Sequence, residues 1–132
     1  MMLEIEAIHH VAILTGTELY GSCKLFYTEV LGFTIVSEQY REERNSYKLD
    51  LALNGRYQVE LFSFPEYKPR ASFPEAQGLR HLAFAVKDVK AGYEWLQLKN
   101  VKLEEIRIDE MTGKEFLFFY DPNDQPLELY QQ

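Results

Sequence analysis

The chain has 132 residues, of which 46% are apolar, and its 14 basic and 21 acidic residues give a net charge of −7. This length favours a single domain with one substantial core. The acidic balance argues against nucleic acid as a partner, because phosphate binding depends on lysine and arginine. There is no apolar run of about 18 residues and no signal-peptide pattern, so we expect no membrane partner and a cytoplasmic location.

The first half of the chain predicts a strand, a helix and three further strands. Residues 5–14 alternate between two faces as a strand does, and ELYGSCKLFYTEVLG (18–32) has apolar residues at helical spacing before Gly32. Three more strands are predicted, at 33–40, 47–53 and 58–64. Asn54 and Gly55 are typical of a hairpin turn. The first module, about 5–64, therefore reads βαβββ.

The second half repeats this order. The segment PEYKPRASFPEAQG (65–78) holds three of the five prolines and is interpreted as a linker. A strand at 79–86 and a helix at 88–100, with Asp88 as its N-cap, follow. The remaining strands are predicted near 102–108, 115–120 and 126–131. The second module, about 79–131, is βαβββ again, so we predict an α+β fold with two tandem modules in one domain, 1–132.

Each module begins with a strand that carries a histidine followed two residues later by alanine. His10 precedes Ala12 in AIHHVAIL, and His81 precedes Ala83 in GLRHLAFAV. Strand alternation places each histidine on the face of its alanine, where the small side chain leaves room beside the imidazole. By the same alternation His9 lies on the opposite face, and we interpret it as structural or exposed.

The last strand of each module carries a carboxylate between apolar residues. Glu60 lies in VELF and Glu128 in LELY, 50 and 47 residues after His10 and His81. A buried carboxylate without a partner is costly, so each needs a counter-charge or a metal. If the two halves curl around a common centre, the four side chains form an N₂O₂ set. Such a set suits one divalent ion, Zn²⁺, Ni²⁺, Mn²⁺, Co²⁺ or Fe²⁺. The alternative is that Glu60 and Glu128 lie on a solvated face.

Five segments together resemble the glyoxalase branch of the vicinal oxygen chelate superfamily: IHHVAI, FYTEVLGF, VELF, GLRHLAFAV and DPNDQPLELY. The resemblance implies paired βαβββ modules that form a cupped half-barrel sheet around a metal. It also implies that His10, Glu60, His81 and Glu128 are the metal ligands. Where the family commonly has DPDG this chain has DPND, so Asp124 takes the place of a glycine, which a left-handed turn tolerates. Relatives of this size often build each site from two chains, so we expect a homodimer.

The ligand types resemble those of glyoxalase I, the lactoylglutathione lyase, more than those of extradiol dioxygenases, which use two histidines and one glutamate. This implies a lyase or isomerase that moves a proton through an enediolate, with Glu128 or Glu60 as the base. The family's glutathione-binding arginine and asparagine would fall at Leu14 and Phe64. These apolar residues argue against glutathione as the thiol.

Three hypotheses for function follow. The first is a metal-dependent lyase or isomerase that acts on a small vicinal-oxygen molecule. The second is a metal-dependent dioxygenase or epimerase on the same scaffold, and the third is a module that binds a small toxic molecule without chemistry, as some antibiotic-resistance relatives do. Arg41, Arg44 and Arg70 are candidates for binding an anionic substrate group, although exposed arginines are usually only solvated.

Overall fold

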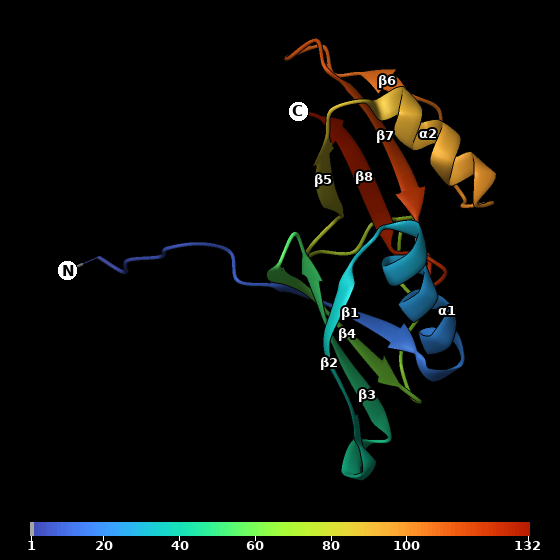
Figure 1. Ribbon diagram of the computed structural model, residues 1–132. Helices are drawn as coiled ribbons and strands as arrows, with labels where there is room; N and C mark the ends of the chain where they lie inside the picture. Colours follow the sequence, from blue (N-terminus) through green and yellow to red (C-terminus); the bar gives the residue numbers. More distant parts are fainter. Residues whose placement is uncertain (1) are drawn as a thin grey trace. The chain divides into compact units, whose positions relative to one another are not determined.

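A computed structural model describes residues 2–132 of the chain (Figure 1). The chain divides into two compact units, of which the first ends at Tyr67 and the second runs from Lys68 to Gln132. Each unit has one four-stranded sheet, and a helical segment follows the first strand of each sheet. This arrangement confirms the predicted α+β class and the internal duplication.

The first unit contains β1 (Val11–Gly16), α1 (Tyr20–Leu25), β2 (Thr34–Arg41), β3 (Ser46–Leu53) and β4 (Arg56–Phe64). Its strands lie in the order β1-β4-β3-β2, with β1 parallel to β4 and the other pairs antiparallel. The predicted helix forms as a 3-10 turn, then α1, then a π-helical turn (Phe26–Val30). Asn54 and Gly55 both have positive φ, as expected for the hairpin turn between β3 and β4.

The second unit contains β5 (Leu82–Val86), α2 (Val89–Leu98), β6 (Arg107–Ile108), β7 (Glu115–Tyr120) and β8 (Pro126–Gln131). The order β5-β8-β7-β6 repeats that of the first sheet, again with the first strand parallel to the last. Asp88 caps α2 as predicted, because its carboxylate accepts a hydrogen bond from the N–H of Ala91 at 3.0 Å. Asp124 has a φ of +61°, which confirms the left-handed turn before β8. Within residues 2–132, neither helix is long and apolar enough to cross a bilayer.

Three predicted strands begin later than the alternation indicated. Residues 2–10 form no strand, and the start of this segment extends away from the first sheet (dark blue in Figure 1), so the prediction of a strand from residue 5 was wrong at that end. The pairing of β1 with β4 starts at Val11 and Val59. Likewise β5 starts at Leu82, and β6 covers only the end of the predicted 102–108. Alternation shows which face a side chain prefers, but it does not show whether a partner strand is available.

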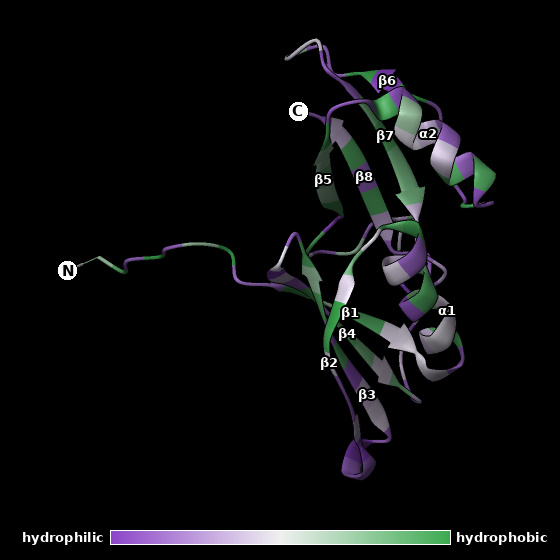
Figure 2. Cartoon of the chain, viewed as in Figure 1, coloured by the Kyte–Doolittle hydropathy of each residue, from purple (hydrophilic) through white to green (hydrophobic). Residues whose placement is uncertain are grey.

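The two faces of each sheet differ in polarity, and β8 shows this as alternating hydrophobic and hydrophilic residues (Figure 2). In the first unit one face is buried with the helical segment to form the core. Its core residues include Ile13, Leu49, Leu51, Val59, Leu61, Cys23, Phe26 and Tyr27. In the second unit the core includes Leu96, Leu117, Phe119, Leu127 and Leu129. The opposite face of each sheet carries the histidine and glutamate that the sequence singled out.

Candidate functional site

The predicted ligands occupy the same register in both units. In the first unit Ala12 of β1 pairs with Glu60 of β4, and His10 lies two residues before Ala12. In the second unit Ala83 of β5 pairs with Glu128 of β8, and His81 lies two residues before Ala83. Each histidine thus immediately precedes the first residue of its strand. We call His10 with Glu60 the first half-site, and His81 with Glu128 the second half-site.

Both half-sites bring an imidazole nitrogen close to a carboxylate oxygen. The distance from Nε2 to Oε1 is 4.0 Å between His10 and Glu60, and 3.1 Å between His81 and Glu128. The glutamate side chains are only 11% and 12% exposed, whereas the histidine side chains are 36% and 27% exposed. The carboxylates are therefore mostly buried while the imidazoles remain open to solvent, so an ion can reach each pair.

The spacing of each pair fits two ligands of one metal ion. Two bonds of about 2.1 Å at a tetrahedral angle place the ligand atoms about 3.4 Å apart, and the observed 3.1 and 4.0 Å lie on either side of this value. Within residues 2–132 no group of three or more histidine, cysteine, aspartate or glutamate side chains is arranged to hold a metal. Each half-site thus has the spacing for two ligands of one ion, and the predicted four-ligand site remains a prediction.

A β-bulge turns Tyr57 onto the face of the first sheet that carries Glu60. We call this face, and the face of the second sheet that carries Glu128, the ligand face. Leu51 of β3 pairs with Val59, but the next residue, Ala52, pairs with Tyr57, so Gln58 is an extra residue in β4. Regular alternation would place Tyr57, three residues before Glu60, on the other face. Such bulges commonly redirect a side chain beside a functional site.

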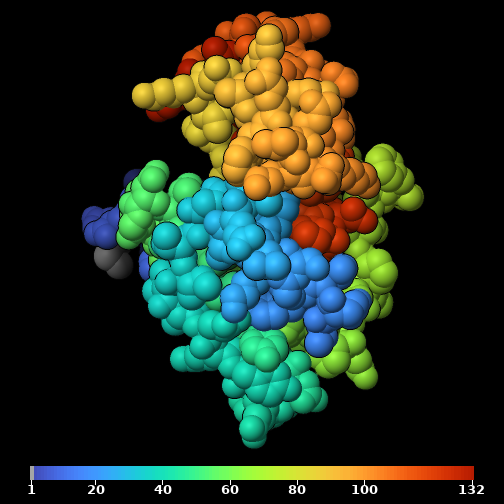
Figure 3. All heavy atoms as spheres, turned by 45° about the vertical axis from the view of Figure 1, so that its right-hand side comes forward, coloured from blue at the N-terminus to red at the C-terminus, as the bar shows by residue number. Residues whose placement is uncertain are grey.

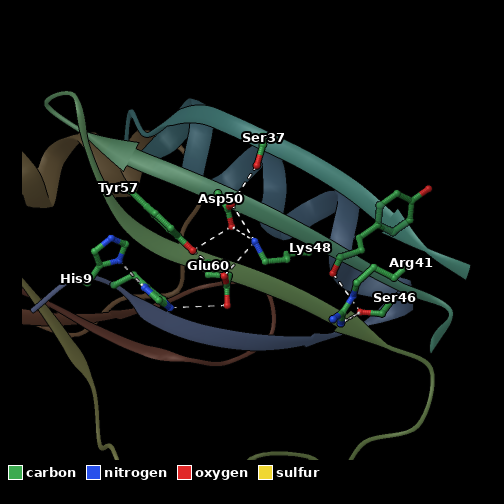
Figure 4. Close-up of polar contacts among 10 residues, drawn as sticks. His9, Ser37, Arg41, Ser46, Lys48, Asp50, Tyr57 and Glu60 are labelled. Atoms are coloured by element: carbon green, nitrogen blue, oxygen red, sulfur yellow. Dashed lines mark hydrogen bonds and ion pairs between the residues drawn. The ribbon is translucent and has the colours of Figure 1, made fainter. Parts of the chain in front are cut away.

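Tyr57 contacts both predicted ligands of the first half-site (Figure 4). Its hydroxyl donates to Oε2 of Glu60 at 2.7 Å and also lies 3.0 Å from Oδ1 of Asp50. Its ring stacks on that of His10, with centroids 5.0 Å apart and planes 9° apart. Burial and the hydrogen bond to Glu60 raise the pKa of the Tyr57 hydroxyl. The hydroxyl therefore stays protonated and acts as a donor at neutral pH.

Lys48 and Asp50 complete a charged cluster around Glu60 (Figure 4). The Nζ atom of Lys48 lies 2.9 and 3.0 Å from the two oxygens of Asp50 and 3.3 Å from Oε2 of Glu60. The hydrogen bond to Asp50 raises the pKa of Lys48. Burial opposes charge on Asp50, yet hydrogen bonds from three neighbours, led by Lys48, hold its pKa below the ordinary value. One cation and two carboxylates leave a net charge of −1 beside His10.

His9 lies nearer to the ligands than alternation predicted. Its Nδ1 lies 2.8 Å from Nδ1 of His10, and its ring meets Tyr57 edge-on at 5.3 Å. Because β1 begins only at Val11, strand alternation does not apply to residues 9 and 10. His9 is nevertheless exposed, as expected.

The second half-site has an aromatic setting instead of a charged one. Phe118 of β7 pairs with Glu128, at the position that Asp50 holds opposite Glu60, and it meets His81 edge-on at 4.9 Å. The guanidinium of Arg107 lies 5.2 Å from the ring of Phe116 and 5.4 Å from that of Phe118. Phe118 therefore lines the ligand face, whereas its neighbours Leu117 and Phe119 are in the core.

Other residues singled out in the sequence have varied settings. Leu14 is 45% exposed on the ligand face of β1, and Phe64 stacks with Phe62, so both positions are apolar as expected. Arg70 donates to the carbonyl oxygens of Leu79 and Arg80, which gives it a structural role in the second unit.

Sequence reasoning missed Tyr57, Lys48 and Asp50. Lys48 and Asp50 could have been predicted from strand alternation, because both alternate with the core residues of β3 and so lie on the face opposite the core. No sequence signal indicates the bulge that places Tyr57.

Comparisons with known proteins identify the family. The family model of the Glyoxalase/Bleomycin resistance protein/Dioxygenase superfamily matches residues 7–129, and the chain belongs to this superfamily. It is 54% identical over 131 residues to the uncharacterized protein YaeR of Escherichia coli K12, covering 99% of this chain and 100% of that protein. It is 52% identical over 128 residues to the uncharacterized protein YwkD of Bacillus subtilis 168, covering 97% and 98%.

Solved structures agree with the fold. A glyoxalase family protein from Enterococcus faecalis is 42% identical with a TM-score of 0.87, covering 95% of this chain and 97% of that one. Glyoxalase I of Leishmania major (22% identical, TM-score 0.72) and the fosfomycin resistance protein FosX of Listeria monocytogenes (14%, TM-score 0.72) share the fold alone. A variant of FosX was solved in complex with Mn(II) and a dihydroxypropylphosphonic acid.

Proposed function

We propose that this protein is a divalent-metal-dependent lyase or isomerase, similar to glyoxalase I, that acts on a small substrate with two vicinal oxygens. The observation that carries the proposal is the pair of His–Glu half-sites in identical register in two modules. Structures that share the fold include a glyoxalase I and a fosfomycin resistance protein, and one of them was solved with Mn(II). The proposed ligands of one metal ion are His10, Glu60, His81 and Glu128.

When bound, the metal would polarise the two substrate oxygens and stabilise negative charge that develops on them. A carboxylate of the chain takes a proton from one carbon of the substrate and returns it to the neighbouring carbon, so the substrate passes through an enediolate. The partly buried glutamates, which are held by the last strands of the sheets, keep this base close to the substrate carbons.

The two glutamates have different freedom to move. Glu60 is held at Oε2 by Tyr57 and Lys48. Glu128 has one polar side-chain contact among residues 2–132, the imidazole of His81. A base must leave its ligand position to meet the substrate, so we assign this role to Glu128 and the role of a fixed ligand to Glu60.

Exchange with solvent deuterium tests the reaction class. 2-Oxoaldehyde hemithioacetals and vicinal diols would be screened in D₂O with metal-loaded protein, and the product would be analysed by proton NMR. We expect deuterium at the carbon that receives the proton, and Glu128→Gln should abolish turnover while retaining metal better than Glu60→Gln. Oxygen uptake during turnover would instead indicate the dioxygenase. Tight binding without any exchange would indicate a binding protein.

A further inference from the structure

Arg41 lies on the same face of the first sheet as Glu60. It is the last residue of β2 and pairs with Ser46 of β3. Ser46 shares a face with Asp50, which pairs with Glu60 in β4. The side chain of Arg41 reaches back over β4, since its guanidinium carbon lies 4.9 Å from the ring centroid of Phe62.

Phe62 follows Glu60 by two residues, which is roughly 7 Å along a strand on one face. The distance between the guanidinium and the first half-site is therefore about the length of one small molecule. Nη2 of Arg41 donates to Oγ of Ser46 at 3.0 Å. This hydrogen bond, drawn in Figure 4, and the stacking on Phe62 together fix the direction of the guanidinium in the absence of any ligand.

The charge of Arg41 has no counter-charge in the part of the chain that the structure describes, residues 2–132. No carboxylate lies within ion-pair distance of its guanidinium, and its Nε is a buried donor without an acceptor. Two other cations on these sheets, Lys48 and Arg107, are paired. Lys48 contacts Asp50 and Glu60, and Arg107 contacts Glu104 at 3.2 Å. A partly buried and unpaired charge is costly, so a site that keeps one is suited to an anionic ligand.

We propose that Arg41, positioned by Ser46 and Phe62, binds an anionic group of the substrate. A planar guanidinium offers two parallel N–H donors to two oxygens, which suits a carboxylate, a phosphate or a phosphonate. The inference rests on the proposed function, because the vicinal oxygens of the same substrate would lie at the Glu60 end of this face. The substrate class is then a small anion that carries its vicinal oxygens a few bonds from its charged group.

Binding of methylphosphonate to the metal-free protein tests this site apart from the metal chemistry. The ¹⁵N–¹H signal of the Arg41 Nε group would be followed by NMR during the titration, and Arg41→Gln identifies it by its loss. Arg44→Gln is the matched control, because Arg44 lies three residues later on an exposed turn that protrudes beyond β2 and β3 (Figure 3). Glycerol, which carries vicinal oxygens without charge, is the neutral control.

We expect methylphosphonate to shift the Arg41 Nε signal, and Arg41→Gln to weaken its binding at least about tenfold, the size of one lost charge-assisted interaction. Arg41→Lys keeps the charge but loses the two-donor geometry, so its affinity for methylphosphonate should lie between those of wild type and Arg41→Gln. Arg44→Gln should change affinity by less than about twofold. Equal losses in the Arg41→Gln and Arg44→Gln variants, or an unmoved Arg41 signal, would overturn the proposal. Because the titration uses metal-free protein, its outcome does not depend on the proposed metal site, and failure of that site would be seen separately in the metal content of the protein.

Discussion

Replacing Tyr57 by phenylalanine removes one hydroxyl from the first half-site and leaves its aromatic ring. The hydroxyl donates to Oε2 of Glu60 at 2.7 Å, whereas the ring stacks on His10 at 5.0 Å. Tyr57→Phe therefore frees Glu60 from one of its two donors and retains the support of His10. Loss of one such partner of a metal ligand typically lowers metal affinity about 10- to 100-fold. We expect a loss in this range, and a larger one for Tyr57→Leu, which also removes the stacking.

Tyr40→Phe is the matched control, because it deletes the same hydroxyl from an exposed tyrosine that donates to Asn45 at 3.2 Å. Metal affinity would be measured by competition with a chromophoric chelator for Zn²⁺ and Ni²⁺. Thermal unfolding of the metal-free proteins would show that all three variants are folded. If Tyr57→Phe bound metal as tightly as Tyr40→Phe, the role assigned to Tyr57 in holding Glu60 would be wrong.

Three further predictions concern the substrate, the pH dependence of stability and the assembly. Turnover of the methylglyoxal–glutathione hemithioacetal should be weak or absent with Ni²⁺ or Zn²⁺, and Leu14→Arg should improve it; a metal-dependent kcat/KM of about 10⁵ M⁻¹s⁻¹ in wild type would show that glutathione is held by other residues. Hydrogen bonds from Lys24 and Tyr20 hold the pKa of Glu38 below its ordinary value. Ionised Glu38 therefore stabilises the folded state at a pH above its pKa in the unfolded chain, and this stabilisation is lost as the pH falls through its pKa in the folded state. Glu38→Gln should therefore lower the Tm at pH 7 and much less at pH 3, and an equal loss at both would contradict this. If the metal site is shared between two chains, mixing His10→Ala with Glu128→Ala protein should restore about one metal site per heterodimer, whereas a monomer that binds metal would place both half-sites in one chain.

The order of elements could be predicted from the sequence because its signals are local. The hairpin turn at Asn54 and Gly55 and the cap at Asp88 depend on residues adjacent in the chain, and both are confirmed. Histidine and alanine recur at the same spacing at the start of both modules, and in the structure the alanine of each module pairs with its glutamate.

The surroundings of the half-sites could not be predicted, because they depend on pairing between strands. The bulge at Gln58 brings Tyr57 to the face of Glu60, and no local pattern marks it. The alternation over 5–10 predicted a strand that does not form, because the pairing with β4 begins only at Val11. The unpaired state of Arg41 likewise depends on which carboxylates the sheet brings near it.

The content of bound metal in the purified protein tests the four-ligand site most directly. Wild-type protein loaded with Zn²⁺, Ni²⁺ or Mn²⁺ and freed of excess ion would be analysed by mass spectrometry of its metals, beside His81→Ala and His9→Ala. We predict about one divalent ion per chain in wild type and in His9→Ala, and almost none in His81→Ala, which lacks one of the four ligands. Stoichiometric metal in His81→Ala would contradict the assignment of the two half-sites to one metal centre.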